Sequence, residues 1–260
     1  MAFANLKFFS EALKMQCEIS VVIPQKSAAG EIGITSGAGK DGKYKCLYLL
    51  HGLSDDHTIW ARRTSIERYA QQYGIAVVMP CGARSFYTNM KYGGAYYDYI
   101  AKEVPRIVRE FFNVSDKRED NAIAGLSMGG YGALKIGMRE SDSFFAAAGL
   151  SSVADVKAFM KLERYAEVAA PIFGENVDIP DSEDLFALAV ELEGKAVKPR
   201  LYMGVGKQDF LYEHNQKLRR HIESLDLDYT YRESDGIHSW DFWDEYIQYV
   251  LAWAFGSQNK

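Results

Sequence analysis

The chain has 260 residues, a formal net charge of −5, 25% charged residues and 48% hydrophobic residues. This length is sufficient for one large domain or two small ones with a well-developed core. The sequence contains no basic cluster, so neither nucleic acid nor an anionic membrane surface is an expected partner. No run reaches the roughly 20 apolar residues that a membrane-spanning helix needs, and membrane insertion is not expected.

The N-terminal sequence and the cysteines bear on the cellular compartment. The first sixteen residues, "MAFANLKFFSEALKMQ", lack the charged leader, apolar run and cleavage site of a signal peptide. The three cysteines, Cys17, Cys46 and Cys81, are widely spaced, and each lies in apolar sequence. We therefore expect buried free thiols and a cytoplasmic location.

Apolar runs typical of strands alternate with helical patterns along the chain. Strands are expected at 17–24, 44–52, 74–80, 121–126, 144–152, 199–206 and 228–234, and helices near 60–73, 95–112, 129–139, 212–224 and 240–254. This alternation predicts an α/β fold with a mostly parallel, doubly wound sheet and helices on both faces. No helix separates the two N-terminal strands, so they are expected to form a hairpin-like antiparallel start.

Residues 152–197 interrupt the alternation, because they carry helical pieces around the loop "PIFGENVDIPDSE" and no strand pattern. We interpret them as an insertion within a single domain that spans residues 1–260. Insertions in doubly wound sheets commonly lie over the carboxyl ends of the strands, where ligands bind. The segment is therefore predicted to form a small cap, and a longer crossover with no role in the site is the alternative.

The glycine-rich loop at 28–43 contains "GAGKDG", which matches a dinucleotide-binding pattern and resembles a phosphate loop. Both kinds of site need a helix directly after the glycines, whereas here a strand follows. Tyr44 also stands where a phosphate loop needs a magnesium-binding serine or threonine. A surface turn is the expected structure, and no cofactor or metal is predicted.

The segment "NAIAGLSMGGYGALKIG" places one serine among glycines, between a predicted buried strand and a predicted helix. This is the context in which Gly125-x-Ser127-x-Gly129 forms a nucleophile elbow. The glycines allow neighbouring backbone to pass closely, and the amides at the helix start face developing negative charge. Ser127 is therefore the predicted nucleophile.

A serine nucleophile needs a base, and the base needs a carboxylate that fixes its tautomer. His238 lies in the loop between the last strand and the last helix, as the chain order serine, acid, histidine requires. Asp209 follows a buried strand and is the predicted acid, with Asp235 in reserve because it lies only three residues from His238. His214 and His221 fall on a helical pattern, where a structural role is the default.

Two backbone amides are expected to stabilise the oxyanion of a tetrahedral intermediate. Met128 follows the nucleophile, and Leu53 follows His51-Gly52 in "LLHGLSDD", after the predicted strand at 44–52. Four large residues beside these motifs either line the substrate pocket or belong to the core: Trp60, Tyr87, Leu211 and Trp240.

The blocks "YLLHGLSDDHTIW", "AGLSMGGYGALK", "GKQDFLYEHN" and "HSWDFW" occur in this order along nearly the whole chain. Together they resemble the α/β-hydrolase esterases of the esterase D and tributyrin esterase type. The resemblance implies a serine carboxylesterase that hydrolyses short acyl esters without a cofactor. It assigns Ser127, Asp209 and His238 to the catalytic triad, and Leu53 and Met128 to the oxyanion hole.

The resemblance leaves the substrate open beyond a small-molecule ester. The same group contains S-formylglutathione hydrolases, feruloyl and acetyl-xylan esterases and mycolyl transferases. Formylglutathione enzymes typically carry a threonine and a cysteine after the leucine where this chain has "SDD", which argues against that thioester. A binding protein with the same fold and no chemistry is the alternative from another class, and the complete triad argues against it. A homo-oligomer is compatible with the sequence.

Overall fold

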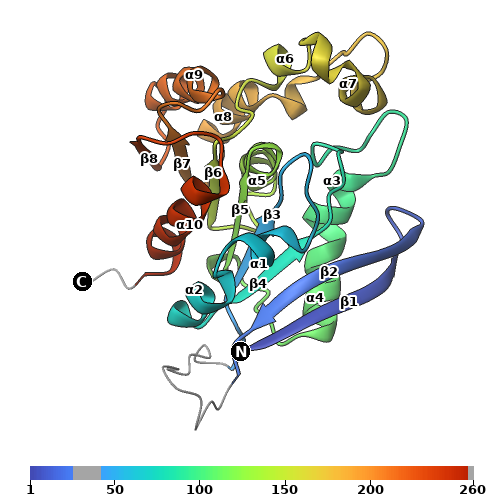
Figure 1. The fold of residues 1–260 in the computed structure, drawn as a ribbon, viewed down its shortest axis with the longest axis vertical. Coiled ribbons are helices and arrows are strands. Elements are labelled where there is room, and N and C mark those ends of the chain that lie inside the picture. Colours follow the sequence, from blue (N-terminus) through green and yellow to red (C-terminus); the bar gives the residue numbers. More distant parts are fainter. Residues whose placement is uncertain (26–41, 257–260) are drawn as a thin grey trace.

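The computed structural model describes residues 1–25 and 42–256 (Figure 1). The glycine-rich loop at 28–43 therefore lies outside the described residues, apart from its last two positions. Within the described ranges, no helix combines the length and apolar composition needed to cross a lipid bilayer.

An eight-stranded sheet of order β1-β2-β4-β3-β5-β6-β7-β8 forms the centre of the molecule. The six strands β4, β3, β5, β6, β7 and β8 pair in parallel with their neighbours in this order. The strand β1 pairs antiparallel with β2, and β2 pairs antiparallel with β4. This sheet confirms the predicted α/β-hydrolase fold. The strands are β1 Ala2–Ser10, β2 Met15–Ile23, β3 Cys46–Leu50, β4 Ala76–Pro80, β5 Asn121–Leu126, β6 Ala146–Leu150, β7 Arg200–Gly206 and β8 Tyr229–Ser234.

The antiparallel start of the sheet differs from the prediction. The strand predicted at 17–24 forms its hairpin with β1, which the sequence analysis missed, and not with the strand predicted at 44–52. β1 is an edge strand that leaves Phe3 and Phe9 about half exposed. Because its outward face carries phenylalanines as well as polar residues, the alternation that marks a half-buried strand is weak.

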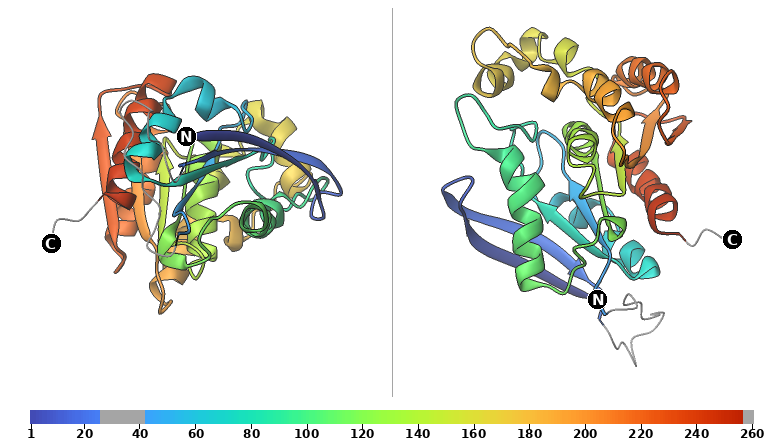
Figure 2. Two further views of the ribbon diagram at one scale, coloured as in Figure 1. Left: turned by 90° about the horizontal axis from the view of Figure 1, so that it is seen from below. Right: turned by 180° about the vertical axis from the view of Figure 1, so that it is seen from behind.

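Helices cover both faces of the sheet (Figures 1 and 2). One apolar core lies against α2 and α10, and the other lies against α4, α5, α8 and α9. The helices outside residues 152–197 are α1 Ile59–Arg63, α2 Ile66–Tyr73, α3 Tyr96–Asp98, the π-helix Tyr99–Glu103, α4 Val104–Phe111, the 3₁₀ turn Arg118–Asp120, α5 Met128–Arg139, α9 Tyr212–Glu223 and α10 Trp240–Phe255.

Residues 152–197 form a group of short helices next to α9, as Figure 1 shows. They are α6 Val156–Phe159, α7 Ala166–Phe173, α8 Leu185–Glu193 and the 3₁₀ turns Glu163–Tyr165 and Asp181–Glu183. A buried ion pair joins this segment to α5, with 2.5 Å between Lys135 Nζ and Glu183 Oε2.

The three cysteines carry free thiols, as predicted. Cys46 is buried, but Cys17 and Cys81 are only partly buried, so the prediction of three buried thiols is wrong for these two. Cys17 lies on β2 and Cys81 directly follows β4, both at the antiparallel side of the sheet, whereas Cys46 begins the strand β3, which has parallel neighbours on both sides.

Candidate active site

Ser127 lies in a strained turn directly between β5 and α5. Its φ of 55° and ψ of −116° are unfavourable for any residue with a Cβ, and such strain is concentrated at functional sites. Main-chain bonds hold the turn, since the Ser127 N–H donates to the Leu150 carbonyl at 2.8 Å and its carbonyl accepts from the Val153 N–H at 3.2 Å.

The two flanking glycines are required by close backbone packing around this turn. A Cβ on Gly125 would collide with the carbonyl group of Gly129. A Cβ on Gly129 would lie 2.5 Å from the carbonyl oxygen of Leu50, on β3. The Gly-x-Ser-x-Gly pattern therefore allows β5, α5 and β3 to meet beneath the serine.

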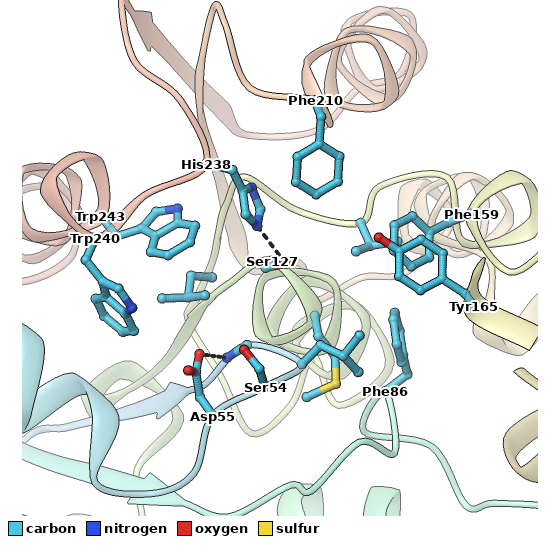
Figure 3. A pocket seen from close by; sticks show the side chains of 15 residues that line it. Ser54, Asp55, Phe86, Ser127, Phe159, Tyr165, Phe210, His238, Trp240 and Trp243 are labelled. Atoms are coloured by element: carbon cyan, nitrogen blue, oxygen red, sulfur yellow. Dashed lines mark hydrogen bonds between the residues drawn. The ribbon is translucent and has the colours of Figure 1, made fainter. Parts of the chain in front are cut away.

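The structure brings Ser127, His238 and Asp209 into one hydrogen-bonded chain (Figure 3 shows the first pair). His238 Nε2 lies 3.1 Å from Ser127 Oγ, and His238 Nδ1 lies 2.9 Å and 3.1 Å from the two carboxylate oxygens of Asp209. A proton on Nδ1 satisfies the carboxylate and leaves Nε2 free to accept the serine proton. This arrangement can generate an alkoxide nucleophile.

The surroundings of the imidazole fix its orientation. The Asp209 side chain is fully buried, and its Oδ1 also accepts the Leu211 N–H at 2.8 Å. The rings of Phe210 and Trp243 lie 4.6 Å and 4.8 Å from the His238 ring. The reserve carboxylate, Asp235, is exposed and accepts from Gln208 instead.

The two predicted oxyanion donors, Leu53 and Met128, both line the cavity beside Ser127. Met128 is the first residue of α5, so its N–H has no carbonyl one turn earlier within the helix to bind. The carbonyl of Gly52, which shares a peptide plane with the Leu53 N–H, lies 2.7 Å from His51 Nδ1. Because the two groups of a trans peptide point in opposite directions, holding the carbonyl also fixes the direction of the Leu53 N–H.

The role of the His51 side chain was missed by the sequence analysis, which treated His51 only as the residue before Gly52. His51 Nε2 accepts the Gly82 N–H at 2.8 Å, so the ring proton sits on Nδ1 and is donated to Gly52. Burial lowers the pKa of His51 to about 4 and keeps the ring neutral. The Tyr87 hydroxyl donates to the His51 carbonyl at 2.8 Å and further fixes this loop.

A cavity of about 350 Å³ opens above Ser127. Figure 3 shows Trp240 and Trp243 on one side of Ser127, and Phe86, Phe159 and Tyr165 on the other. The residues that line the cavity are Gly52, Leu53, Ser54, Asp55, Phe86, Leu126, Ser127, Met128, Val153, Phe159, Tyr165, Phe210, His238, Trp240 and Trp243.

Of the four large residues beside the motifs, Trp240 lines this cavity, whereas Trp60, Tyr87 and Leu211 do not line it and belong to the core, the alternative that the sequence left open. Trp60 is buried behind Trp240 and donates its indole N–H to the Leu50 carbonyl at 3.0 Å. Tyr87 is buried under the loop of residues 51–53, which we call the oxyanion loop, and Leu211 is buried directly before α9. Proximity in sequence to a motif residue does not determine which side of the wall a side chain occupies.

Several side chains that form the cavity were not predicted from the sequence. Phe210 and Trp243 lie close in sequence to Asp209 and His238, and that adjacency was their only signal. Phe159 and Tyr165 come from the insertion, where no motif marks them. Across residues 1–25 and 42–256, no three His, Cys, Asp or Glu side chains are grouped as metal ligands.

Comparison with known proteins identifies relatives over nearly the whole chain. The protein family described as "Putative esterase" matches residues 10–253. An acetyl esterase of Caldicellulosiruptor saccharolyticus is 31% identical over 97% of this chain and 98% of its own.

Two solved structures from Staphylococcus aureus are also similar. The substrate-bound fluorophosphonate-binding serine hydrolase F, FphF, is 36% identical with a TM-score of 0.87, and each chain is covered to 98%. An S-formylglutathione hydrolase, FrmB, is 35% identical with a TM-score of 0.84 and the same coverage.

Proposed function

The chain belongs to this esterase family and is a serine esterase that hydrolyses carboxylic esters, and on that premise we propose that its substrates are short-chain acyl esters cleaved by Ser127, His238 and Asp209. The observation that carries the proposal is the hydrogen-bonded chain from Ser127 through His238 to Asp209 at the base of an aromatic cavity.

In the proposed mechanism, Ser127 Oγ attacks the ester carbonyl while His238 Nε2 takes its proton. The amides of Leu53 and Met128 stabilise the oxyanion, each contributing about 10²–10³ in rate. His238 then gives the proton to the leaving alcohol, and an acyl-enzyme forms on Ser127. A water molecule, deprotonated by His238, attacks the acyl group and frees the acid and Ser127.

The similarity to an acetyl esterase supports a small acyl group. The insertion contributes Val153, Phe159 and Tyr165 to the cavity, and we propose that residues 152–197 act as a cap that limits acyl length. The free thiols support a reducing, cytoplasmic environment.

A series of p-nitrophenyl esters from acetate to laurate, together with methyl ferulate, tests the proposal. We expect kcat/KM to be highest between acetate and butyrate, and kcat to fall by up to about 10⁶ in Ser127→Ala. Preference for laurate or ferulate would contradict the proposed acyl group. Undiminished activity in the Ser127→Ala variant would contradict the proposed nucleophile.

A thioesterase for S-formylglutathione is a second candidate, because FrmB is 35% identical over 98% of both chains. A kcat/KM for S-formylglutathione far above that for p-nitrophenyl acetate would favour it. The ferulic acid esterase matches are at most 22% identical and support the fold alone.

A further inference from the structure

Asp55 places a carboxylate in the wall of the substrate cavity, where the proposed mechanism does not use it. The residue lies two positions after Leu53, and its Oδ2 accepts the Gly52 N–H at 3.2 Å. The Asp55 N–H also bonds the Gly52 carbonyl, at 3.3 Å. These two bonds hold the carboxylate beside the oxyanion loop (Figure 3).

The charge of Asp55 is not balanced inside the cavity. Apart from the His238 imidazole and the Tyr165 phenol, the other described residues that line the cavity are glycine, apolar, aromatic or serine, and Asp55 is the one carboxylate among them. No described residue forms an ion pair with Asp55. The charge of Arg63 favours the ionised form of Asp55, but Arg63 lies on α1 and does not line the cavity. Burial raises the pKa of Asp55, because its ionised form has lost part of its water. A cation from the substrate would replace that lost solvation.

Two indole rings line the same cavity as Asp55, and Figure 3 shows them to the left of Ser127, with Asp55 below it. Trp240 lies edge-on to Trp60 and to Trp243, with centroids 5.2 Å apart in both pairs, so both cavity-lining indoles are held rigidly. The faces of aromatic rings carry partial negative charge and attract ammonium groups. The guanidinium carbon of Arg164 lies 5.0 Å from the ring centroid of Tyr165 and 6.0 Å from that of Phe210. Both rings line the cavity, but Arg164 itself does not.

We propose that Asp55, Trp240 and Trp243 form a subsite that accepts substrates carrying a cationic ammonium group or a neutral group and rejects anionic ones. The inference rests on the proposed esterase function and names the charge class of its substrates. Opposite charges at close range attract each other more strongly in a partly desolvated site than in water, and like charges repel each other correspondingly. A thioester of a carboxylate-bearing peptide thiol is therefore disfavoured.

Three isosteric thioacetates measure this selectivity at pH 8: those of thiocholine (cationic), 3,3-dimethylbutanethiol (neutral) and 2-mercaptoethanesulfonate (anionic). A second series carries the corresponding three groups on the acyl side, as p-nitrophenyl esters of 4-(trimethylammonio)butanoate, 5,5-dimethylhexanoate and 4-sulfobutanoate. The variant Asp55→Asn keeps an oxygen that can accept the Gly52 N–H and removes the charge. Comparing each substrate between wild type and variant cancels differences in intrinsic reactivity.

We expect the cation-to-anion ratio of kcat/KM to fall about tenfold in Asp55→Asn in at least one series. The matched control is Asp56→Asn, which removes the same charge from the next, exposed residue outside the cavity, and should leave the ratio unchanged. In wild type, the ratio should shrink as salt rises from 20 to 500 mM, which tests the charge effect without a variant.

The two ideas fail in different ways. If wild type does not hydrolyse p-nitrophenyl acetate, the proposed esterase function is contradicted, and the subsite with it. If p-nitrophenyl acetate is hydrolysed but the ratio in both series is unaffected by Asp55→Asn and by salt, the charged subsite alone is overturned.

Discussion

The two walls of the cavity are held in place by different kinds of interaction. Ser127, Asp209 and His238 each lie within four residues of the end of a parallel strand, where the backbone ladder of the sheet fixes the chain. Phe159 and Tyr165, on the opposite wall, come from short helices of the insertion and contact each other at 4.0 Å between ring centroids. The three side chains of the proposed triad thus follow strands held by main-chain bonds, whereas Phe159 and Tyr165 are positioned by side-chain packing.

A buried ion pair anchors the insertion wall to the helix α5. Lys135 on α5 is fully buried and contacts Glu183 of the insertion at 2.5 Å and the carbonyl of Phe86 at 3.1 Å. Thr88 and Arg139 also donate to the Glu183 carboxylate, at 2.9 Å and 3.1 Å. One buried network therefore holds the insertion and the cavity-lining Phe86 against the helix that follows Ser127.

The largest expected effect comes from the strand side, in the variant Asp209→Asn. The carboxylate that fixes the His238 tautomer is lost while the shape is retained, so kcat should fall about 10⁴-fold. KM for p-nitrophenyl acetate and the free energy of unfolding should change little by comparison. Asp235→Asn is the matched control, and a loss in that variant equal to the loss in Asp209→Asn would contradict the assignment of the acid.

On the insertion side, Glu183→Gln should lower the free energy of unfolding by about 3–5 kcal/mol, because it leaves the buried Lys135 ammonium uncompensated. Urea denaturation measures the change. Asp181→Asn, which removes an exposed charge from the same 3₁₀ turn, should cost less than about 1 kcal/mol. The double variant Glu183→Gln with Lys135→Met should recover part of the loss, and equal stability of Glu183→Gln and wild type would show that the network is no anchor.

The difference between the walls also explains what the sequence could predict. The strands β5 and β7 are buried, nearly continuous apolar runs, so Ser127 and Asp209 could be proposed from the strand ends that they follow. His238 follows the half-buried strand β8 and could be proposed from chain order. Edge strand β1 was missed because its exposed face carries Phe3 and Phe9. The pocket residues of the insertion could not be identified, because their directions depend on tertiary contacts such as that of Lys135 with Glu183, which no local pattern records.

The strand side should also be sensitive to acid through His51. Its pKa is about 4 in the folded protein against 6.5 ordinarily, so the unfolded chain takes up the proton first. The stability that the neutral His51 ring contributes is fully present above pH 6.5 and is lost as the pH falls. The loss in the free energy of unfolding reaches about 3 kcal/mol by pH 4. Urea denaturation at pH 7.5, 5.5 and 4.5 measures how the free energy of unfolding falls with pH. This fall should be smaller in His51→Gln than in wild type and unchanged in the control His57→Gln. An equal fall in wild type and both variants would contradict the prediction.

The smallest expected effect concerns the shape of the insertion wall. Tyr165 is partly exposed, lines the cavity and stacks on Phe159, so Tyr165→Ala should lengthen the pocket without removing a core side chain. Because each buried methylene contributes about 0.8 kcal/mol, room for two more carbons should raise kcat/KM for hexanoate relative to acetate about tenfold. Leu162→Ala, an exposed position of the same insertion outside the cavity, should leave that ratio unchanged. An unaltered chain-length profile in Tyr165→Ala would mean that the strand side alone sets the acyl pocket, and that the insertion does not act as a cap on it.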